Sequence, residues 1–443
     1  MKKILVIGAG RSSSSLIRYL TELLESNNWH LRIADRDLDL AKEKINGAAN
    51  AEAISFNALN RDERIPHLEW ADIVVSMLPA AFHLDIAKDC VLLKKNLITP
   101  SYITPEMKAL EKDCKANGVF ILNELGLDPG IDHMSAMKII DGIKAQGGEI
   151  ERFESFTGGL VAPQSDTNPW SYKFTWNPRN VILAGQGSAA TFLQNGKYKF
   201  VPYNKLFSRT KEIEIDSYGV FEGYANRDSL SYIEVYGLTG IPTIYRGTLR
   251  RKGYSEAWDT FVQLGCTDDS YVLPDTENMT YREYINSFLI YHTELTVEKK
   301  LQDSLGLSNE VMDKLKWLGI FEDKIIGVKG LSPAKVLQKK LEEKWSLEPD
   351  DKDLIVMYHK FSYSLKGENF DIISSLAVEG EDQTYTGMSN TVGLPLGIAV
   401  KLVLQGKLSL TGVHLPVIPE IYEPILKELG ELGVVFKEKE YKC

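Results

Sequence analysis

The first 126 residues alternate short apolar runs with helical stretches, and this alternation limits the fold more than any other feature of the sequence. Six largely apolar runs predict strands: "KILVIGAG", "HLRIAD", "AEAISF", "DIVVSML", "NLITPSY" and "GVFILNEL". Continuous apolar runs are typical of strands that are buried on both faces of a parallel sheet. Strands that alternate with helices predict a doubly wound α/β fold of the Rossmann type, with its ligand at the carboxyl ends of the strands.

The loop after the first predicted strand, "GAGRSSSS", has the features that a dinucleotide requires. Gly8 permits a tight turn, and Gly10 lets backbone amides approach a pyrophosphate at the N-terminus of the next helix. Ser13 replaces the third glycine of the G-x-G-x-x-G pattern, so the motif is weak by itself. Asp35 supports it, because it ends the second strand 25 residues after Gly10, near the position of the carboxylate that binds the adenosine ribose.

The charge at the end of the second strand bears on the choice of cofactor. A carboxylate at Asp35 favours the free ribose hydroxyls of NAD and repels the additional phosphate of NADP. Arg36, the next residue, could instead attract that phosphate or lie over the adenine ring. We expect NAD and keep NADP as the alternative. A glycine-rich turn without a cofactor is the structural explanation that this pattern leaves open.

The stretch "NELGLDPGIDHM", residues 123–134, ends the sixth predicted strand and precedes a helix. Pro129 and Gly130 suit a type II turn, in which the glycine takes a positive φ. Asp128 can serve that turn, but it also stands at the strand edge where a nicotinamide and its substrate should meet. Asp132 falls in the first turn of the helix, where a negative charge meets the positive end of the helix dipole.

The rest of the chain changes character several times. Residues 150–265 contain the predicted strands "RFESFTGGL", "SYIEVYGL" and "PTIYRGTLR", and residues 277–345 are helical and charged. "DLIVMYHKFSYSL" and "FDIISSLAVEG" predict two strands joined at Lys366-Gly367, and helices return from about residue 391. Because no repeat or obvious linker separates these parts, we expect a substrate region that is inserted between parts of one folded unit.

Arginines beside aromatic or small residues mark three segments of this region: "YKFTWNPR", "GYANRDS" and "YRGTLR". A buried arginine is costly unless it is paired, which indicates carboxylate partners. The partner is either a protein aspartate, such as Asp228 or Asp259, or a substrate with several carboxylates. His83 and His133 each lie at the end of an element, and we interpret them as structural hydrogen-bonding groups before catalytic ones.

Composition restricts the partners and the location. The net charge of −10 argues against a nucleic-acid partner, because such proteins usually carry a basic excess. Cys90, Cys114, Cys266 and Cys443 form no C-x-x-C pair, so we expect neither a zinc site nor a disulfide framework. We find neither a signal-peptide cleavage site after "MKKILVIGAG" nor a stretch of about 20 apolar residues, and we expect no membrane segment and a cytoplasmic location.

Longer motifs along almost the whole chain resemble the saccharopine dehydrogenase (L-glutamate-forming) family. They are "PSYITPEMKALEKDC", "ELGLDPGIDHMSAMKIID", "GGLVAP", "NPWSYKFTWNPRNVILAGQ", "NRDS", "YRGTLRRKGY" and "TVGLPLGIAVKLVLQG". The family includes fungal saccharopine reductase and the dehydrogenase half of the bifunctional lysine-degrading enzyme. The resemblance implies a Rossmann-type domain at 1–130, completed by about 385–443. It also implies an inserted α+β substrate domain at 131–384, with a mixed sheet and a helical part at about 277–345.

The activity that the resemblance implies is a reversible hydride transfer. Saccharopine, NAD or NADP, and water give L-glutamate and 2-aminoadipate 6-semialdehyde, in lysine degradation if NAD is used. Matching positions place Tyr102 and Asp128 at the reacting centre. The residues expected to bind the substrate are Ser101, Tyr102, Asp128, Trp176, Asn177, Arg227, Arg246 and Thr248. Those expected to bind the cofactor are Gly8, Gly10, Arg11, Ser12, Ser13, Asp35, Arg36, Asn57, Leu78, Pro79, Ser101 and Leu127, with no metal site.

Two departures from the family pattern bear on chemistry. Thr157 stands where the family often has cysteine, so an essential cysteine is not expected here. Asp35 stands where the fungal, NADP-using members tend to have a small neutral residue, which favours the NAD-using, degradative branch. The alternatives are an NADP-dependent saccharopine reductase of lysine biosynthesis, a carboxylated-polyamine dehydrogenase, and a non-catalytic NAD-sensing scaffold. The partners expected are small molecules, and a homodimer is an open alternative to a monomer.

Overall fold

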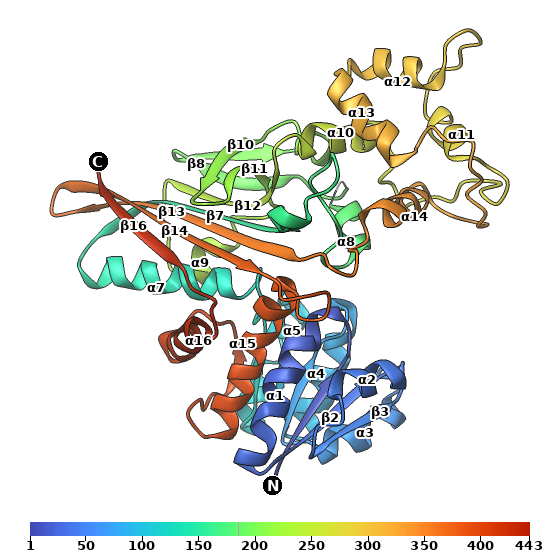
Figure 1. Ribbon diagram of the computed structural model, residues 1–443. Helices are drawn as coiled ribbons and strands as arrows, with labels where there is room; N and C mark the ends of the chain where they lie inside the picture. The colour runs from blue at the N-terminus through green and yellow to red at the C-terminus, as the bar shows by residue number, and fades with distance from the viewer. Residues whose placement is uncertain (185) are drawn as a thin grey trace. The chain divides into compact units, whose positions relative to one another are not determined.

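The computed structural model describes residues 1–184 and 186–443, which form two compact units (Figure 1). The terminal unit comprises Met1–Ile150 and Tyr363–Cys443 and contains both ends of the chain. The central unit is Glu151–Ser362, inserted between those two parts. An inserted region was predicted, although with boundaries at 131 and 384 in place of 151 and 362.

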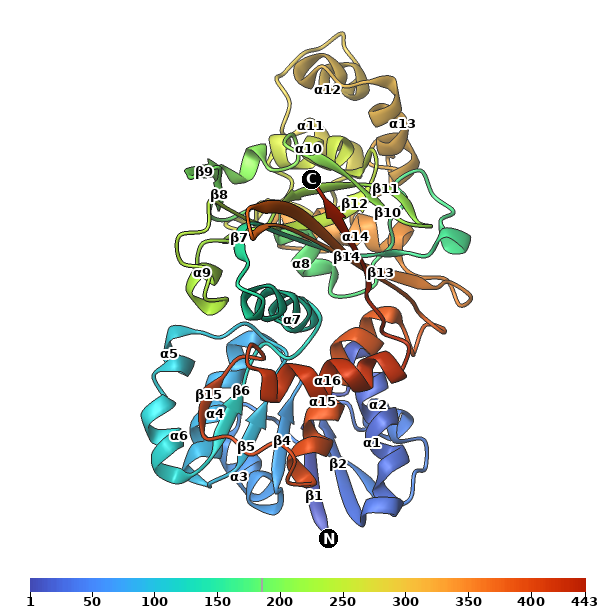
Figure 2. The ribbon, with the colours of Figure 1, turned by 90° about the vertical axis from the view of Figure 1, so that its left-hand side faces the viewer.

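The terminal unit is built on a parallel sheet of seven strands in the order β15-β6-β5-β4-β1-β2-β3 (Figure 2). The strands are β1 (Lys2–Ile7), β2 (Trp29–Asp35), β3 (Ala51–Ser55), β4 (Ile73–Ser76), β5 (Asn96–Ile98), β6 (Phe120–Leu122) and β15 (Gly412–His414). The first six match the six predicted strands, and the doubly wound α/β fold is confirmed. The order reverses between β1 and β4, which is where such sheets bind ligands.

Helices follow most of these strands and cover the sheet. They are α1 (Ser14–Asn27), α2 (Leu38–Ile45), α3 (Arg61–Trp70), α4 (His83–Leu92), α5 (Pro105–Lys108), α6 (Glu111–Asn117), α7 (Ile131–Ala145), α15 (Gly387–Leu404) and α16 (Pro419–Glu431). Short 3-10 turns, η1 (Arg11–Ser13) and η2 (Ala80–Phe82), precede α1 and α4. Thr104 caps α5 by accepting a hydrogen bond from the Met107 amide, as its position before Pro105 predicts.

Both faces of the sheet are buried, as the apolar character of β1 requires. Leu5 and Ile7 belong to a core cluster that also contains Leu97 from β5 and Ile86 from α4. Ile4 and Val6 alternate with these residues along β1 and are also fully buried, so they face the opposite layer. Each such side chain contributes about 1.5–3 kcal/mol when it is removed from water.

Helix α15 packs closely against α1, and the two lie side by side in Figure 1. Glycines on α15 permit this approach, because a Cβ at Gly393 would lie 2.8 Å from the Leu16 nitrogen and one at Gly397 would lie 2.6 Å from the Tyr19 ring. By length and composition α15 could cross a membrane, the one described helix to do so, yet 72% of its apolar window is buried inside the structure. Its apolar character is therefore explained by packing.

The remaining elements explain why the units divide where they do. Helix α7 packs on α16, and the Tyr422 hydroxyl of α16 donates to the Asp141 carboxylate of α7 at 2.7 Å. Strand β14 (Glu368–Glu379) pairs antiparallel with β16 (Lys437–Lys442). Because α16 and β16 belong to the C-terminal part, α7 and β14 cluster with the terminal unit and not with the inserted region.

The central unit has a mixed sheet, as predicted. Strands β10 (Lys211–Ile215), β11 (Gly219–Ala225) and β12 (Thr243–Arg251) are antiparallel, and β12 is parallel to β7 (Glu149–Val161). Strand β13 (Asp353–Leu365) lies next to β7 in the sheet, on the side away from β12. Strand β8 (Ala190–Gln194) pairs with β12 and with β9 (Lys197–Val201). The helices are α8 (Pro178–Leu183), α9 (Tyr232–Val235), α10 (Tyr254–Leu264), α11 (Tyr281–Asn286), α12 (Val297–Leu305), α13 (Asn309–Leu318) and α14 (Pro333–Trp345).

One predicted strand of this unit is wrong. "SYIEVYGL" was expected to be extended, but Tyr232–Val235 forms helix α9. The Asp228 carboxylate accepts hydrogen bonds from the Leu230 and Ser231 amides, which turns the chain just before the helix.

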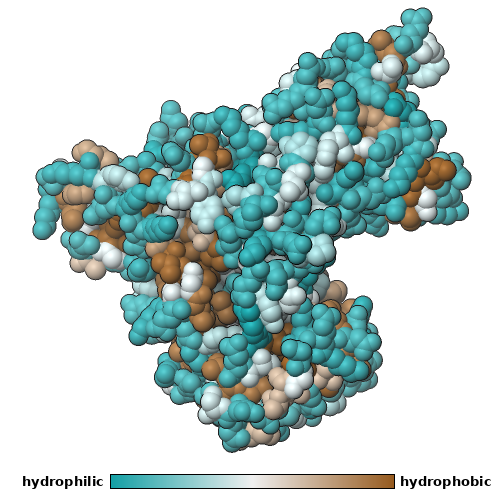
Figure 3. Space-filling view, in the orientation of Figure 1, coloured by the Kyte–Doolittle hydropathy of each residue, from teal (hydrophilic) through white to brown (hydrophobic). Residues whose placement is uncertain are grey.

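The surface visible in Figure 3 is largely hydrophilic, in keeping with the acidic composition.

The contact between α15 and α1 can be tested with Gly393→Ala. In an open helix position this substitution stabilises by about 0.5–1 kcal/mol, and Gly142 of α7 is such a position, since a Cβ there meets nothing within 4 Å. We expect Gly142→Ala to raise the free energy of unfolding and Gly393→Ala to lower it by about 1–3 kcal/mol, because α15 must move away from α1. Urea denaturation measures both. Equal stabilisation by the two variants would contradict the close approach.

Candidate functional site

The predicted residues of the terminal unit lie at the carboxyl edge of the parallel sheet. Every strand of a parallel sheet ends at the same edge, so loops that are distant in sequence meet there. Gly8, Gly10, Arg11, Ser12 and Ser13 follow β1, Asp35 and Arg36 end β2, Asn57 follows β3, Leu78 and Pro79 follow β4, Ser101 and Tyr102 follow β5, and Leu127 and Asp128 follow β6. The fold thus brings the predicted cofactor residues and the two predicted catalytic residues to one edge.

The glycine loop after β1 fits a dinucleotide. Gly8 has φ of 108° and lies against Met77, where a Cβ would come within 3.2 Å of the backbone. A Cβ at Gly10 would meet nothing within 4 Å, so this part of the loop borders open space. The Ser15 amide in the first turn of α1 donates to the Ser389 hydroxyl at 2.9 Å, so an anion would be met by the amides of the preceding loop and η1, where Gly10 provides no side-chain cap.

Asp35 binds the backbone of the glycine loop and also places a negative charge at the carboxyl edge of the sheet. Its Oδ2 accepts a hydrogen bond from the Ala9 amide at 2.7 Å, and its Oδ1 accepts one from the Asp37 amide at 3.0 Å. The exposed Arg36 side chain donates to the Asn57 Oδ1 atom at 3.1 Å. A carboxylate and a guanidinium therefore both stand where the adenosine ribose of a dinucleotide should lie.

Tyr102 and Asp128 form a polar pair at the same edge. The Tyr102 hydroxyl donates to the Asp128 Oδ1 atom at 3.1 Å. Tyr102 is 45% exposed and Asp128 is half-buried, so both groups can meet a ligand. The family resemblance implied that both residues lie at the reacting centre, and the structure shows them in direct contact.

The turn that carries Asp128 is not the predicted type II turn. Gly130 has φ of 146° and ψ of −86°, whereas a type II turn needs about 80° and 0°. The Asp128–Pro129 peptide bond is cis. The glycine itself was correctly singled out, because a Cβ at Gly130 would lie 2.1 Å from the Gly126 carbonyl oxygen. The Gly126 amide in turn donates to the Pro129 carbonyl at 2.9 Å, which closes the loop.

The two histidines are buried and hydrogen-bonded, as their structural interpretation requires. His83 Nδ1 lies 2.9 Å from the Ser76 hydroxyl and Nε2 lies 2.7 Å from the Ser101 hydroxyl. Burial lowers the pKa of His83 to about 4, so its imidazole is neutral near pH 7 and holds Ser101 without adding charge. His133 lies 2.8 Å from the Glu124 carboxylate.

The central unit brings some of the predicted substrate residues together on its sheet. Arg246 and Thr248 are two residues apart on β12, so their side chains leave the same face. The Arg246 carbonyl accepts a hydrogen bond from the Asn226 amide, which places Arg227 beside it in the backbone. Thr157 on β7 pairs directly with Thr248. The Arg246 guanidinium is buried and lies 4.1 Å from the centre of the Tyr232 ring.

Other predicted residues of this unit have structural roles. Asn177 caps α8 by accepting a hydrogen bond from the Arg179 amide, and Trp176, just before it, is half-buried. Arg179 pairs with Asp269, a protein carboxylate. The exposed Arg227 donates to the carbonyls of Leu183 and Gln186 at 3.2 and 3.4 Å.

Arg250 is a residue whose surroundings the sequence did not indicate. Its buried guanidinium lies 5.1, 5.9 and 5.4 Å from the ring centres of Tyr172, Tyr224 and Tyr254. Burial raises the pKa of Tyr254 well above its ordinary value, which keeps that hydroxyl protonated beside the cation. Aromatic faces therefore surround this arginine where a carboxylate was expected.

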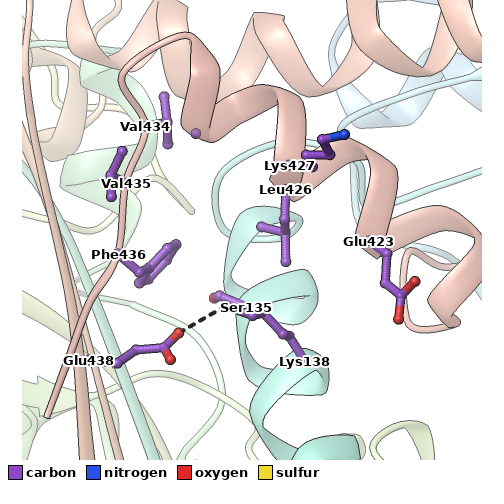
Figure 4. Close-up of a pocket in the computed structure, with 10 residues that line it drawn as sticks. Ser135, Lys138, Glu423, Leu426, Lys427, Val434, Val435, Phe436 and Glu438 are labelled. Carbon is purple, nitrogen blue, oxygen red and sulfur yellow. Dashed lines mark hydrogen bonds and ion pairs between the residues drawn. The ribbon is translucent and has the colours of Figure 1, made fainter.

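Two cavities in the units contain none of the predicted site residues. One of about 440 Å³ in the terminal unit lies between α7, α16 and the segment that leads into β16, with Lys138 and Glu438 paired at 3.3 Å (Figure 4). A more polar one of about 660 Å³ in the central unit is lined by residues of α10, α12 and β11, including Asp259. Among the described residues, no group of three or more His, Cys, Asp or Glu side chains is arranged to hold a metal ion.

Comparison with protein-family models accounts for nearly the whole chain. Residues 4–122 match the model for the saccharopine dehydrogenase NADP binding domain, and residues 126–434 match the saccharopine dehydrogenase C-terminal domain. The chain belongs to the saccharopine dehydrogenase family. Residues 4–122 are therefore the part of this saccharopine dehydrogenase family member that takes a nicotinamide cofactor, and the glycine loop lies within them.

Individual relatives agree with this assignment. The chain is 34% identical to the mitochondrial alpha-aminoadipic semialdehyde synthase of Mus musculus, over 98% of this chain and 47% of that protein. It is 34% identical to the saccharopine dehydrogenase (NADP(+), L-glutamate-forming) of Pyricularia oryzae, over 99% of both chains. The apo, histidine-tagged saccharopine dehydrogenase (L-Glu forming) from Saccharomyces cerevisiae matches with a TM-score of 0.90 at 31% identity, covering 100% of both chains. The chain thus spans about half the length of its mammalian relatives and nearly all of its fungal ones.

The buried His83 makes a testable contribution to acid sensitivity. Its pKa falls from 6.5 to about 4 on folding, so the unfolded chain binds a proton in this range that the folded chain does not. Stability is therefore lost as the pH falls from 6.5 towards 4, by at most about 3 kcal/mol from this group. We expect His83→Gln, which keeps a donor and an acceptor, to flatten the pH dependence of the urea midpoint. An unchanged slope would contradict the neutral buried imidazole.

Proposed function

We propose that this protein oxidises saccharopine to L-glutamate and 2-aminoadipate 6-semialdehyde, with NAD as the acceptor of the hydride. The observation that carries the proposal is the Tyr102–Asp128 pair at the carboxyl edge of a dinucleotide-binding sheet. Family membership and the names of the fungal relatives support the same reaction. The degradative direction follows from the choice of NAD and is part of the proposal.

Asp128 has the properties of the group that moves protons in this reaction. The secondary amine of saccharopine is protonated near pH 7 and must lose that proton before a hydride can leave the neighbouring carbon. A half-buried carboxylate that an adjacent hydroxyl already contacts can accept it. The carboxylate passes this proton to solvent, and it then takes a proton from the water that adds to the iminium carbon left by hydride transfer. It returns that proton to nitrogen and accepts the hydroxyl proton of the carbinolamine as the carbon–nitrogen bond breaks, so that the aldehyde forms and glutamate leaves.

Tyr102 assists this exchange by donating its hydroxyl proton to Asp128 Oδ1. The hydrogen bond helps to orient the carboxylate for the proton steps. A nicotinamide dinucleotide, when bound, supplies the electrophilic carbon that accepts the hydride. Gly8, Gly10 and the amides of η1 would hold its pyrophosphate, and Asp35 its adenosine ribose.

The central unit supplies cations for the three carboxylates of saccharopine. Arg246 and Thr248 leave the same face of β12, and Arg227 is adjacent to them in the backbone. The guanidinium of Arg227 is exposed and, among the described residues, donates to the carbonyl oxygens of Leu183 and Gln186, which carry no formal charge. A planar guanidinium binds a carboxylate through two parallel hydrogen bonds, which suits this substrate. Trp176 and Asn177 belong to the same proposed binding set.

The reaction is tested by following NADH formation from saccharopine with wild-type protein and with Asp128→Asn. We expect saccharopine-dependent NADH from the wild type and a kcat lower by about 10²- to 10⁴-fold in the variant, because the amide cannot take up the proton. Asp85→Asn, an exposed change on α4, serves as a control with wild-type rates. Absence of turnover with both NAD+ and NADP+ would overturn the proposed function. An unchanged kcat in Asp128→Asn would overturn only the role of that residue.

The preference for NAD rests on the carboxylate of Asp35. Its two backbone hydrogen bonds keep it at the end of β2, where the 2′-phosphate of NADP would meet a like charge. The alternative, an NADP-dependent saccharopine reductase, is favoured by the description of the matching family model and by Arg36 beside Asp35. The two differ in one measurable quantity, the ratio of kcat/KM for the two cofactors.

Asp35→Ser separates these alternatives, since serine keeps an acceptor for the Ala9 amide and removes the charge. We expect the ratio of kcat/KM for NAD+ over NADP+ to exceed one in the wild type. In the variant it should fall by about tenfold or more, because a like-charge contact costs at least about 1.4 kcal/mol. Asp39→Ser removes a charge from a 93% exposed side chain on α2 and should leave the ratio unchanged. A wild type that prefers NADP+ would establish the alternative.

A further inference from the structure

We propose that His133 is a positioning residue that joins two backbone clamps, one around Tyr102 and one around Asp128. This inference rests on the proposed function in so far as Tyr102 and Asp128 are the reacting groups. The clamps are formed by Glu124 and Asp132, which are both buried, and neither carboxylate is needed for the proton steps themselves.

The Tyr102 clamp is formed by Glu124. Its amide donates to the Ser101 carbonyl at 3.1 Å, and its Oε1 accepts a hydrogen bond from the Ile103 amide at 2.9 Å. Glu124 thus binds both neighbours of Tyr102: its backbone amide binds Ser101, and its side chain binds Ile103. Glu124 takes φ of 59°, a left-handed conformation that is uncommon for glutamate and brings both groups to the same loop.

The Asp128 clamp is formed by Asp132 in the same way. The Asp132 amide donates to the Leu127 carbonyl at 3.1 Å, and its Oδ1 accepts a hydrogen bond from the Gly130 amide at 2.6 Å. Leu127 and Gly130 flank the Asp128–Pro129 segment. The turn that presents Asp128 is therefore bonded on both sides to the first turn of α7.

His133 lies between the two carboxylates. Its Nε2 is 2.8 Å from Glu124 Oε2 and its Nδ1 is 3.6 Å from Asp132 Oδ2, and its ring is fully buried. In each carboxylate one oxygen binds a backbone amide (Glu124 Oε1 and Asp132 Oδ1), and the other oxygen faces His133. One imidazole thus lies within hydrogen-bond distance of Glu124 and beside Asp132, so it is in contact with both clamps.

The consequence is a fixed relation between the two reacting side chains. The Tyr102 hydroxyl reaches Asp128 across 3.1 Å, and this contact is retained only while both loops keep their places. Tyr102 is 45% exposed, and the backbone groups on either side of it are held by Glu124, so the clamp acts directly on the segment that carries its side chain. The buried Glu124–His133–Asp132 network holds the two loops that carry the reacting groups in place.

The link is tested by hydrogen exchange with two conservative variants of His133. Glutamine places its amide nitrogen near Nε2 and keeps the contact to Glu124, whereas asparagine places its nitrogen near Nδ1 and keeps the contact to Asp132. We expect His133→Gln to speed exchange of the Gly130 amide and spare Ile103, and His133→Asn to do the reverse. Exchange that changes equally at both amides, or at neither, would overturn the link.

Kinetics test whether the link positions the reacting groups. We expect Glu124→Gln to lower kcat for saccharopine by about 10- to 100-fold, through loss of alignment. The dissociation constant for NADH should stay within about twofold of the wild-type value, because the variant keeps the Glu124 amide that binds the Ser101 carbonyl and leaves the glycine loop unchanged. Asp89→Asn is the matched control: Asp89 is a buried carboxylate of α4, paired with Arg64, and its loss should cost stability without this fall in kcat.

The outcomes separate the inference from the proposed function. If the wild type does not oxidise saccharopine, the function fails, while the exchange experiment still decides whether His133 joins the two loops. If the wild type is active and Glu124→Gln keeps its kcat, the positioning role is overturned. A fall in kcat of the same size in Asp89→Asn would also overturn it, because a general loss of stability would then explain both.

Discussion

Strand β1 is apolar on both of its faces, and the arrangement of the terminal unit follows from the need to bury both. Leu5 and Ile7 meet the core that contains residues of α4, while Ile4 and Val6 face the opposite layer. A strand in this position has neighbours on both sides, and helices must then connect parallel strands across the two faces. All strands consequently end at one edge, and residues as far apart as Gly8 and Asp128 share it.

Much of this architecture can be read from the sequence because it depends on local patterns. The six apolar runs predict six strands, and the structure has strands at all six places. Strand β15 was missed because its partner β6 lies about 290 positions earlier in the chain, and no local pattern marks that pairing. "SYIEVYGL" was misread because the Leu230 and Ser231 amides donate to the Asp228 carboxylate and turn the chain there, and alternation of apolar residues does not reveal these bonds.

The candidate site is predictable in its placement and less so in its contacts. Residues at the ends of parallel strands had to meet, so Tyr102 and Asp128 could be assigned to one edge before their contact was seen. The partners of buried arginines could not be assigned, since pairing depends on which elements meet in space. Arg179 pairs with the carboxylate of Asp269, whereas the Arg250 guanidinium lies against three tyrosine rings. Glu124 gave no signal, because its role depends on a left-handed backbone and a loop about 20 residues earlier.

The packing of α15 against α1 has a consequence for the order in which the protein forms during synthesis. The N-terminal segment carries six strands of the sheet, yet the Leu16 and Tyr19 side of α1 is covered by α15, which ends at Leu404. Until that helix emerges from the ribosome, this apolar surface is open to water, although the whole central unit has already been made. Within this sequence the dinucleotide-binding unit therefore begins before the central unit and is completed after it.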